Sequence, residues 1–104
     1  MANPQLENGH TRISNELIEA VVYKITHSSW LKIILWTIRL TYGWGRKEVQ
    51  SNYQSYATKL GVSKDTIKHT LLELNDRKIL TFVALTKEQF VVSVNKNYEL
   101  WKIE

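Results

Sequence analysis

The stretch YQSYATKLGVSKDTIKHTLLELNDRKIL, residues 53–80, decides the fold that we expect for this chain. A first helix that ends at Leu60, a tight turn at Gly61 and a second helix capped by Ser63 match the spacing of a helix-turn-helix. Ala57, four residues before the glycine, supplies the small side chain that two closely crossing helices need. The spacing therefore predicts two helices joined by a sharp turn.

The second of these helices has an apolar stripe and a polar face. Ile67, Leu71 and Leu74 recur at spacings of four and three residues, so we expect this stripe to face the core. The polar residues at the exposed start and on the outward half of the helix are Ser63, Lys64, Asp65, Thr66, Lys68 and His69. We predict that these side chains contact base edges in the major groove, with an ordinary solvated helix face as the alternative. Leu72 is an apolar exception there, suited to a thymine methyl group, the strand pair or a partner protein.

Two segments typical of strands follow the helix pair. ILTFVAL (79–85) and FVVSVN (90–95) are rich in β-branched and aromatic residues and flank the short polar turn TKEQ. A hairpin directly after a helix-turn-helix predicts a winged helix, a mainly α fold with a small β-hairpin. Lys87 at the wing tip is either a DNA backbone contact or a surface charge. Lys78 stands where a glycine is easier, and a positive φ there would cost on the order of 1 kcal/mol.

The chain before the helix pair predicts an arm and two further helices. Residues 1–13 lack apolar periodicity and are expected to form an extended N-terminal arm, which leaves residues 14–104 as the winged-helix domain. Ser14 is a favourable N-cap for a helix over residues 15–25.

The next helix begins at Ser28 or Ser29 and ends near Tyr42, and it is apolar on two sides. An inner stripe of Leu31, Ile34, Leu35 and Ile38 is opposed by Ile33, Trp36 and Leu40. Such a helix is either the buried centre of the domain or offers one face to a second subunit.

The segment TYGWGRKEVQ, residues 41–50, places its glycines after a helix, whereas a phosphate-binding loop of the Walker type precedes one. We predict that Gly43 is a left-handed C-cap and that Trp44 packs back on the last helical turn. Arg46 and Lys47 either complement the helix dipole or contact DNA phosphates.

Composition narrows the possible functions. The net charge of +4 makes polyanions plausible partners. Cysteine is absent, and the three histidines lie in separate segments without the spacing of metal ligands. No apolar run reaches the roughly 18 residues of a membrane span. We therefore expect a protein without metal, cofactor, catalytic site or membrane helix.

Several segments together resemble the N-terminal domain of the bacteriophage replication protein O family, the lambda-type origin-binding initiators. They are ANPQLENGHTRISNELIEAV (2–21), LWTIRLTYGWGRKE (35–48), LGVSKDTIKHTLLELNDRKIL (60–80) and VNKNYELW (94–101). The resemblance spans nearly the whole chain. The Asn-Pro-Gln opening and the Thr-Tyr-Gly-Trp block are its distinctive parts, because helix-turn-helix spacing is shared by many regulators.

This resemblance implies a winged helix that binds repeated double-stranded DNA sites in a phage replication origin, as a homodimer, in the cytoplasm of the bacterial host cell. It implies DNA contact by the helix from Ser63 onward, with Arg46 and Lys47 near passing phosphates. Full-length members add a C-terminal region that recruits helicase-loading proteins, and we expect those partners only through such a region. The alternatives are a winged-helix transcriptional regulator and a winged-helix protein-interaction module.

Overall fold

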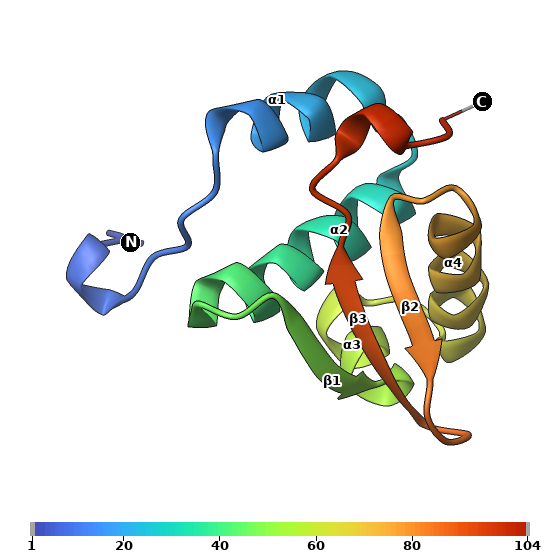
Figure 1. The fold of residues 1–104 in the computed structure, drawn as a ribbon. Coiled ribbons are helices and arrows are strands. Elements are labelled where there is room, and N and C mark those ends of the chain that lie inside the picture. Colours follow the sequence, from blue (N-terminus) through green and yellow to red (C-terminus); the bar gives the residue numbers. More distant parts are fainter. Residues whose placement is uncertain (1, 104) are drawn as a thin grey trace.

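A computed structural model describes residues 2–103 and shows a mixed α/β domain (Figure 1). The described helices are α1 (Asn15–Lys24), α2 (Ser28–Thr41), α3 (Tyr53–Leu60) and α4 (Lys64–Asp76). The strands β1 (Glu48–Asn52), β2 (Leu80–Ala84) and β3 (Gln89–Val94) form an antiparallel sheet in the order β1-β3-β2. Short 3-10 turns are η1 (Leu6–Asn8), η2 (Tyr42–Trp44) and η3 (Tyr98–Leu100). This order of elements is compatible with a winged helix.

The predicted helix pair is confirmed. α3 ends at Leu60, and Gly61 follows with a φ of 70°, in the left-handed region that glycine adopts without strain. The Ser63 hydroxyl oxygen accepts a hydrogen bond from the Thr66 N–H at 3.1 Å and so caps α4. The apolar stripe of α4 is fully buried, as predicted: Ile67, Leu71 and Leu74.

The sheet has one strand more than the predicted hairpin. β1 pairs with β3, with Glu48 opposite Ser93 and Asn52 opposite Gln89. Its sequence EVQSN buries only Val49, so it carries little of the alternating apolar signal that marks a strand. β1 forms because it pairs with the free edge of β3, so it depends on tertiary structure and not on a local sequence pattern.

α2 is the central helix, packed against both β1 and β3 of the sheet and against α3 and α4. Its predicted inner stripe was only partly right, since Ile34 and Ile38 are buried but Leu35 is 45% exposed. The buried residues of α2 are Trp30, Ile33, Ile34, Thr37, Ile38 and Thr41. The two threonines are tolerated inside because both are hydrogen-bonded: Thr37 Oγ1 pairs with the Tyr56 hydroxyl at 2.7 Å, and Thr41 Oγ1 donates to a carbonyl of α2.

The predicted C-cap at Gly43 was wrong. The chain continues beyond α2 as the 3-10 turn η2, and the left-handed residue is Gly45, with a φ of 66°. The ring of Trp44 does not pack on the last turn as an apolar contact, because it is 67% exposed. Its neighbour is the guanidinium of Arg39, whose Cζ lies 5.7 Å from the ring centroid.

Two smaller predictions are confirmed at the ends of elements. The Ser14 hydroxyl oxygen accepts from the Leu17 N–H at 3.2 Å and caps α1, which ends at Lys24. Lys78 has a φ of 60° in the turn between α4 and β2. Before α1, η1 is a short turn away from the body of the domain, whereas Thr11 and Arg12 lie beside the residues that follow α2 (Figure 1).

Candidate nucleic-acid interface

The start of α4 and the turn of the β2–β3 hairpin lie at the same end of the molecule (Figure 1). The Lys64 ammonium joins them, at 3.0 Å from Glu88 Oε2. The Glu88 carbonyl also accepts from the Tyr53 N–H at 3.1 Å, which ties in the start of α3. These contacts fix the position of Lys87, an exposed residue in the same turn, relative to α4.

The six side chains predicted to read bases differ in how free they are. Asp65 and His69 are exposed on α4. The hydroxyls of Ser63 and Thr66 are 2.9 Å apart and hydrogen-bond to each other, so both serve the helix cap. Lys64 and Lys68 are half-buried and face the neighbouring elements.

Lys68 points toward the start of α3. Its ammonium lies 5.1 Å from the centre of the Tyr53 ring, within the range of a cation–π contact. His69 lies on the other side of α4, where it lines a shallow hollow with His27, Trp30, Thr70 and Glu73. The predicted base-reading face of α4 therefore has the hairpin turn on one side and the start of α2 on the other.

Glu88 is a residue of this surface that the sequence did not reveal as functional. The hydrogen bond and charge of Lys64, with a smaller contribution from Lys68, hold the pKa of its carboxyl below the ordinary value. The Glu88 carboxylate therefore interacts with Lys64 and Lys68, which are both candidates for DNA contact. The only sequence signal was the position of Glu88 in the turn TKEQ, next to Lys87.

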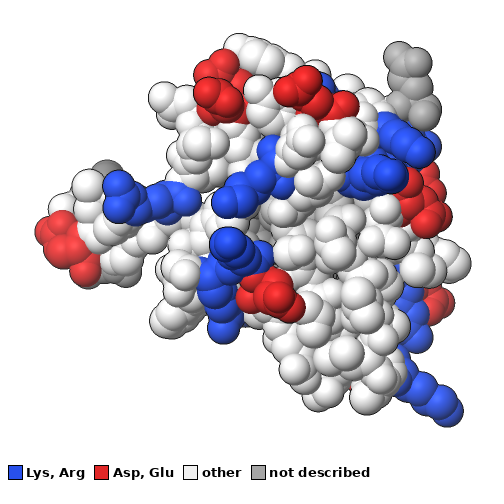
Figure 2. Space-filling view, viewed as in Figure 1, with Lys and Arg blue, Asp and Glu red and all other residues white. Residues whose placement is uncertain are grey.

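Arg46 and Lys47 do not lie beside α4. They precede β1. The first residue of β1 is opposite Ser93, and its last residue is opposite Gln89, next to the hairpin turn. The length of β1 therefore separates them from Glu88 and the start of α4. Figure 2 shows Lys and Arg side chains gathered where the N-terminal segment meets the body, on the side where β1 begins. Their predicted contact with a DNA backbone stays a prediction, as does that of Lys87.

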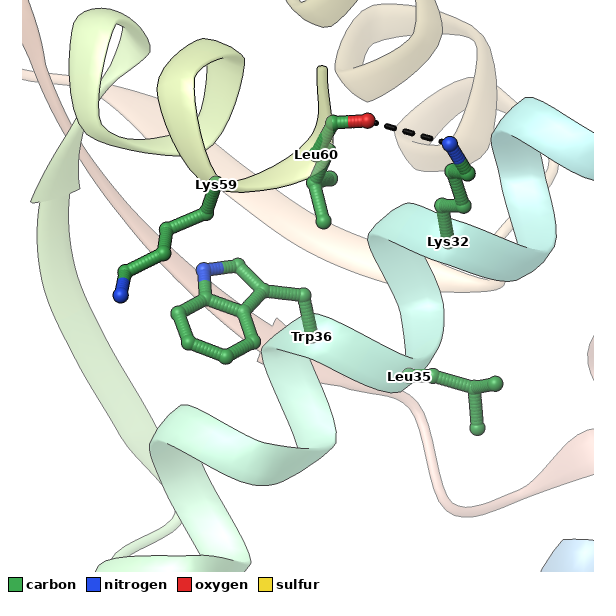
Figure 3. Close-up of a pocket in the computed structure, with 5 residues that line it drawn as sticks. All are labelled: Lys32, Leu35, Trp36, Lys59 and Leu60. Atoms are coloured by element: carbon green, nitrogen blue, oxygen red, sulfur yellow. Dashed lines mark hydrogen bonds between the residues drawn. The ribbon is translucent and has the colours of Figure 1, made fainter. Parts of the chain in front are cut away.

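A mostly apolar hollow between α2 and α3 is a surface of a different kind (Figure 3). It is lined by Lys32, Leu35, Trp36, Lys59 and Leu60. The Lys32 ammonium closes one side by donating to the Leu60 carbonyl at 3.1 Å, and the Lys59 ammonium lies 5.8 Å from the Trp36 ring. The lining offers neither a carboxylate nor a nucleophilic hydroxyl, so it lacks the groups of a hydrolytic centre.

Residues 2–103 contain no group of three His, Asp or Glu side chains placed to hold a metal ion. None of the described helices combines the length and the apolar character that crossing a bilayer requires.

Fold and surface together define a small α/β domain that presents a polar helix and a hairpin turn at one end. Residues 2–101 match the family described as Bacteriophage replication protein O, and the chain belongs to this family. It is 30% identical over 98 residues to "DNA replication protein gp18" of Salmonella phage P22. It is 26% identical over 102 residues to "Replication protein 15" of Enterobacteria phage phi80.

Both alignments cover nearly all of this chain, 94% and 95%, but only 34% and 32% of the two relatives. The chain thus spans about a third of the length of each relative. Family membership and these names support a role in phage DNA replication.

Proposed function

We propose that this chain is a winged-helix domain that binds double-stranded DNA at the repeats of a phage or prophage replication origin and thereby initiates replication. α4 enters the major groove, and the β2–β3 hairpin is the wing. The observation that carries the proposal is the ion pair between Lys64 and Glu88, because it holds the start of α4 and the hairpin turn in one surface. Membership of a replication protein family supports this interpretation.

The roles within this surface follow from how free each side chain is. Asp65 accepts from cytosine N4, His69 donates to a base acceptor, and Lys68 leaves the Tyr53 ring to reach guanine. Ser63 and Thr66 keep the helix start in shape, since their hydroxyls are occupied by the cap. Most of the affinity comes from phosphate contacts, which Lys87 provides and to which Lys64 adds only as far as it is released from Glu88.

The remaining features of the proposal concern partners. We infer a homodimer, which would place two copies of the reading helix on inverted half-sites. Helicase-loading proteins bind a further region of a longer initiator. The domain acts in the bacterial cytoplasm as a binding module and not as an enzyme.

Selection of bound duplexes from a random pool, followed by affinity measurements at several salt concentrations, tests this function. We expect enrichment of repeated or inverted half-sites and affinity that falls with salt. Lys68→Ala and His69→Ala each relax the preference at particular base positions, by about 1 to 3 kcal/mol per lost contact. Lys87→Ala weakens all duplexes alike and lowers the salt slope by about 1.

The matched control is Lys102→Ala, which removes one exposed cation from the C-terminal segment without touching the outward face of α4. It should leave the base preference unchanged. An absence of any enriched sequence, or unchanged discrimination in both the Lys68 and His69 variants, contradicts base reading by α4.

A protein-interaction module is the second candidate, favoured by one observation. Leu72 is 52% exposed on the outward half of α4, where a DNA-reading helix has more use for polar groups. Weak DNA binding with little salt dependence would support that candidate. A transcriptional regulator would use the same DNA-binding surface, and the arrangement of the selected sites distinguishes it from an origin binder.

A further inference from the structure

A second basic surface lies across the sheet from α4. Arg12 of the N-terminal segment, Arg46 and Lys47 after α2, and Lys96 after β3 line one hollow, with the ring of Tyr42 among them. The four cations come from three separate parts of the chain, so no local sequence pattern announces them. Only the fold brings them together.

The charge of this hollow is not neutralised by ion pairs. Within residues 2–103 both ion pairs, Lys64–Glu88 and Arg77–Glu73, involve other side chains. The lining contains no carboxylate, and Glu48 at the start of β1 is the acidic neighbour in sequence. The four cations of the lining therefore favour the binding of an anion.

Two of the cations are held in place. Arg46 Nε donates to the Leu40 carbonyl at the end of α2, at 2.9 Å, which leaves the rest of its guanidinium free. The Lys96 ammonium lies 5.9 Å from the centre of the Tyr42 ring. Arg12 and Lys47 are exposed beside them. The hollow is thus a partly preorganised site for anions.

An exposed aromatic ring stands next to the hollow. Trp44 is 67% exposed and belongs to the same segment as Tyr42 and Arg46. It lines an adjoining hollow with Arg39 and with the residues that precede Arg12 in the chain. Arg39 Cζ lies 5.7 Å from the centre of the Trp44 ring, and most of the ring is exposed. An exposed aromatic ring beside several cations is the combination with which proteins bind unpaired nucleotides, since bases stack on the ring and cations follow the phosphates.

The duplex bound by α4 does not account for this surface. The sheet order β1-β3-β2 puts β1 at the edge away from β2, and α4 packs against β2. The hollow lies at the start of β1, a further ~13 Å along the strand from the hairpin turn at about 3.3 Å per residue. Figure 2 shows basic side chains gathered toward the start of β1, and Figure 1 places α4 on the other side of the sheet, beyond β2.

We propose that this hollow and Trp44 bind single-stranded DNA. The phosphates lie over Arg12, Arg46, Lys47 and Lys96, and a base stacks on the indole ring. This goes beyond duplex recognition by α4 and does not depend on it, because the two surfaces share no residue.

Fluorescence anisotropy of the whole chain with a labelled oligothymidine of roughly 20 nucleotides tests the proposal. A double variant, Lys47→Ala with Lys96→Ala, should bind the oligomer at least about tenfold more weakly at low salt, with the salt slope reduced by about 1.4, that is about 0.7 for each lost phosphate contact. Trp44→Ala should weaken binding by about 5- to 150-fold, while Trp44→Phe retains most of the affinity.

The controls separate this surface from the proposed duplex site. Lys102→Ala and Lys87→Ala should change oligothymidine affinity less than twofold, and the double variant should weaken binding of the selected duplex much less than binding of the single strand. Melting temperatures check that each variant is folded, which we expect because the replaced side chains are exposed.

Three results overturn the proposal: no saturable binding of the single strand, an equal loss of duplex and single-strand affinity in the double variant, or a loss as large in Lys102→Ala. The second result would assign the hollow to the duplex path. Failure of the proposed duplex function looks different, because base preference would be unaffected by Lys68→Ala and His69→Ala while single-strand binding remained.

Discussion

At the scale of single residues, two neighbouring glycines are needed for different reasons. Gly45 has a φ of 66° and an open surrounding, so its requirement is the left-handed backbone itself. Gly43 does not have a positive φ, but a Cβ built there would lie 2.8 Å from Nη1 of Arg39 and 3.0 Å from Oγ1 of Thr11. One position is limited by conformation, the other by the side chains around it.

We predict that Gly45→Ala lowers the free energy of unfolding by about 1 kcal/mol, the cost of a Cβ in the left-handed region. Gly43→Ala should cost less, because the end of the flexible Arg39 side chain can move aside. Urea titrations of the two variants measure the difference. Equal destabilisation by both substitutions would contradict this account.

At the scale of elements, α2 and α3 are joined by a buried polar contact. The hydroxyls of Thr37 and Tyr56 are 2.7 Å apart, and both side chains are fully buried. The Tyr56 ring also packs edge-on against Phe90 of β3, with ring centroids 5.4 Å apart. The contact thus fixes the first helix of the helix-turn-helix against both the central helix and the sheet.

We expect Tyr56→Phe and Thr37→Val each to cost about 1 to 3 kcal/mol, since each leaves one buried hydroxyl without a partner. The double variant should cost less than the sum, because no unpaired hydroxyl then remains. Chemical denaturation of all four proteins completes the cycle. Simple additivity would show that the hydrogen bond contributes nothing specific.

The same contact predicts a loss of stability in alkali. Burial raises the pKa of Tyr56 to about 12, an effect that the Thr37 hydrogen bond partly offsets. The unfolded chain, with a tyrosine pKa of about 10, loses its proton first as the pH rises, so rising pH favours unfolding. Stability should fall between about pH 10 and pH 12 by up to roughly 2 to 3 kcal/mol from this group. In Tyr56→Phe the free energy of unfolding should lose this contribution and fall less between the same pH values. Urea titrations across this pH range measure the difference.

At the scale of the whole molecule, positive charge is divided between two ends of the sheet. One end carries Lys64, Lys68 and Lys87 around the carboxylate of Glu88, and the other carries the basic hollow without an ion pair. The balance between them determines which surface a nucleic acid meets first. Glu88 is the residue that weakens the first of these surfaces.

Glu88→Gln should therefore raise the affinity for duplex DNA several-fold at low salt and increase the salt slope by about 1, since Lys64 becomes free for a phosphate. Binding of the oligothymidine should not change. The melting temperature should change little, because exposed ion pairs contribute little to stability. Glu99→Gln, which removes an exposed carboxylate from η3, is the control, and the same gain in that variant would point to net charge alone.

Predictions from the sequence succeeded where the signal was local. Gly61, Ser63 and the stripe of α4 were placed correctly because caps, turns and helical periodicity involve residues only three or four apart. The inner face of α2 was partly wrong, since apolar residues occur on both sides and only its neighbours select the buried one. Gly43 was mistaken for the cap because a 3-10 turn extends the helix before Gly45.

For this protein, the sequence alone determined the helix pair, the hairpin and the membership in a family of phage replication proteins. Only the tertiary structure decided that β1 joins the sheet, that Glu88 binds a lysine 24 residues away, and that Arg12 and Lys96 meet Arg46 and Lys47. The physical reason is the range of the interactions. Caps and periodicity act within one or two helical turns, whereas strand pairing and charge clusters depend on how distant segments pack.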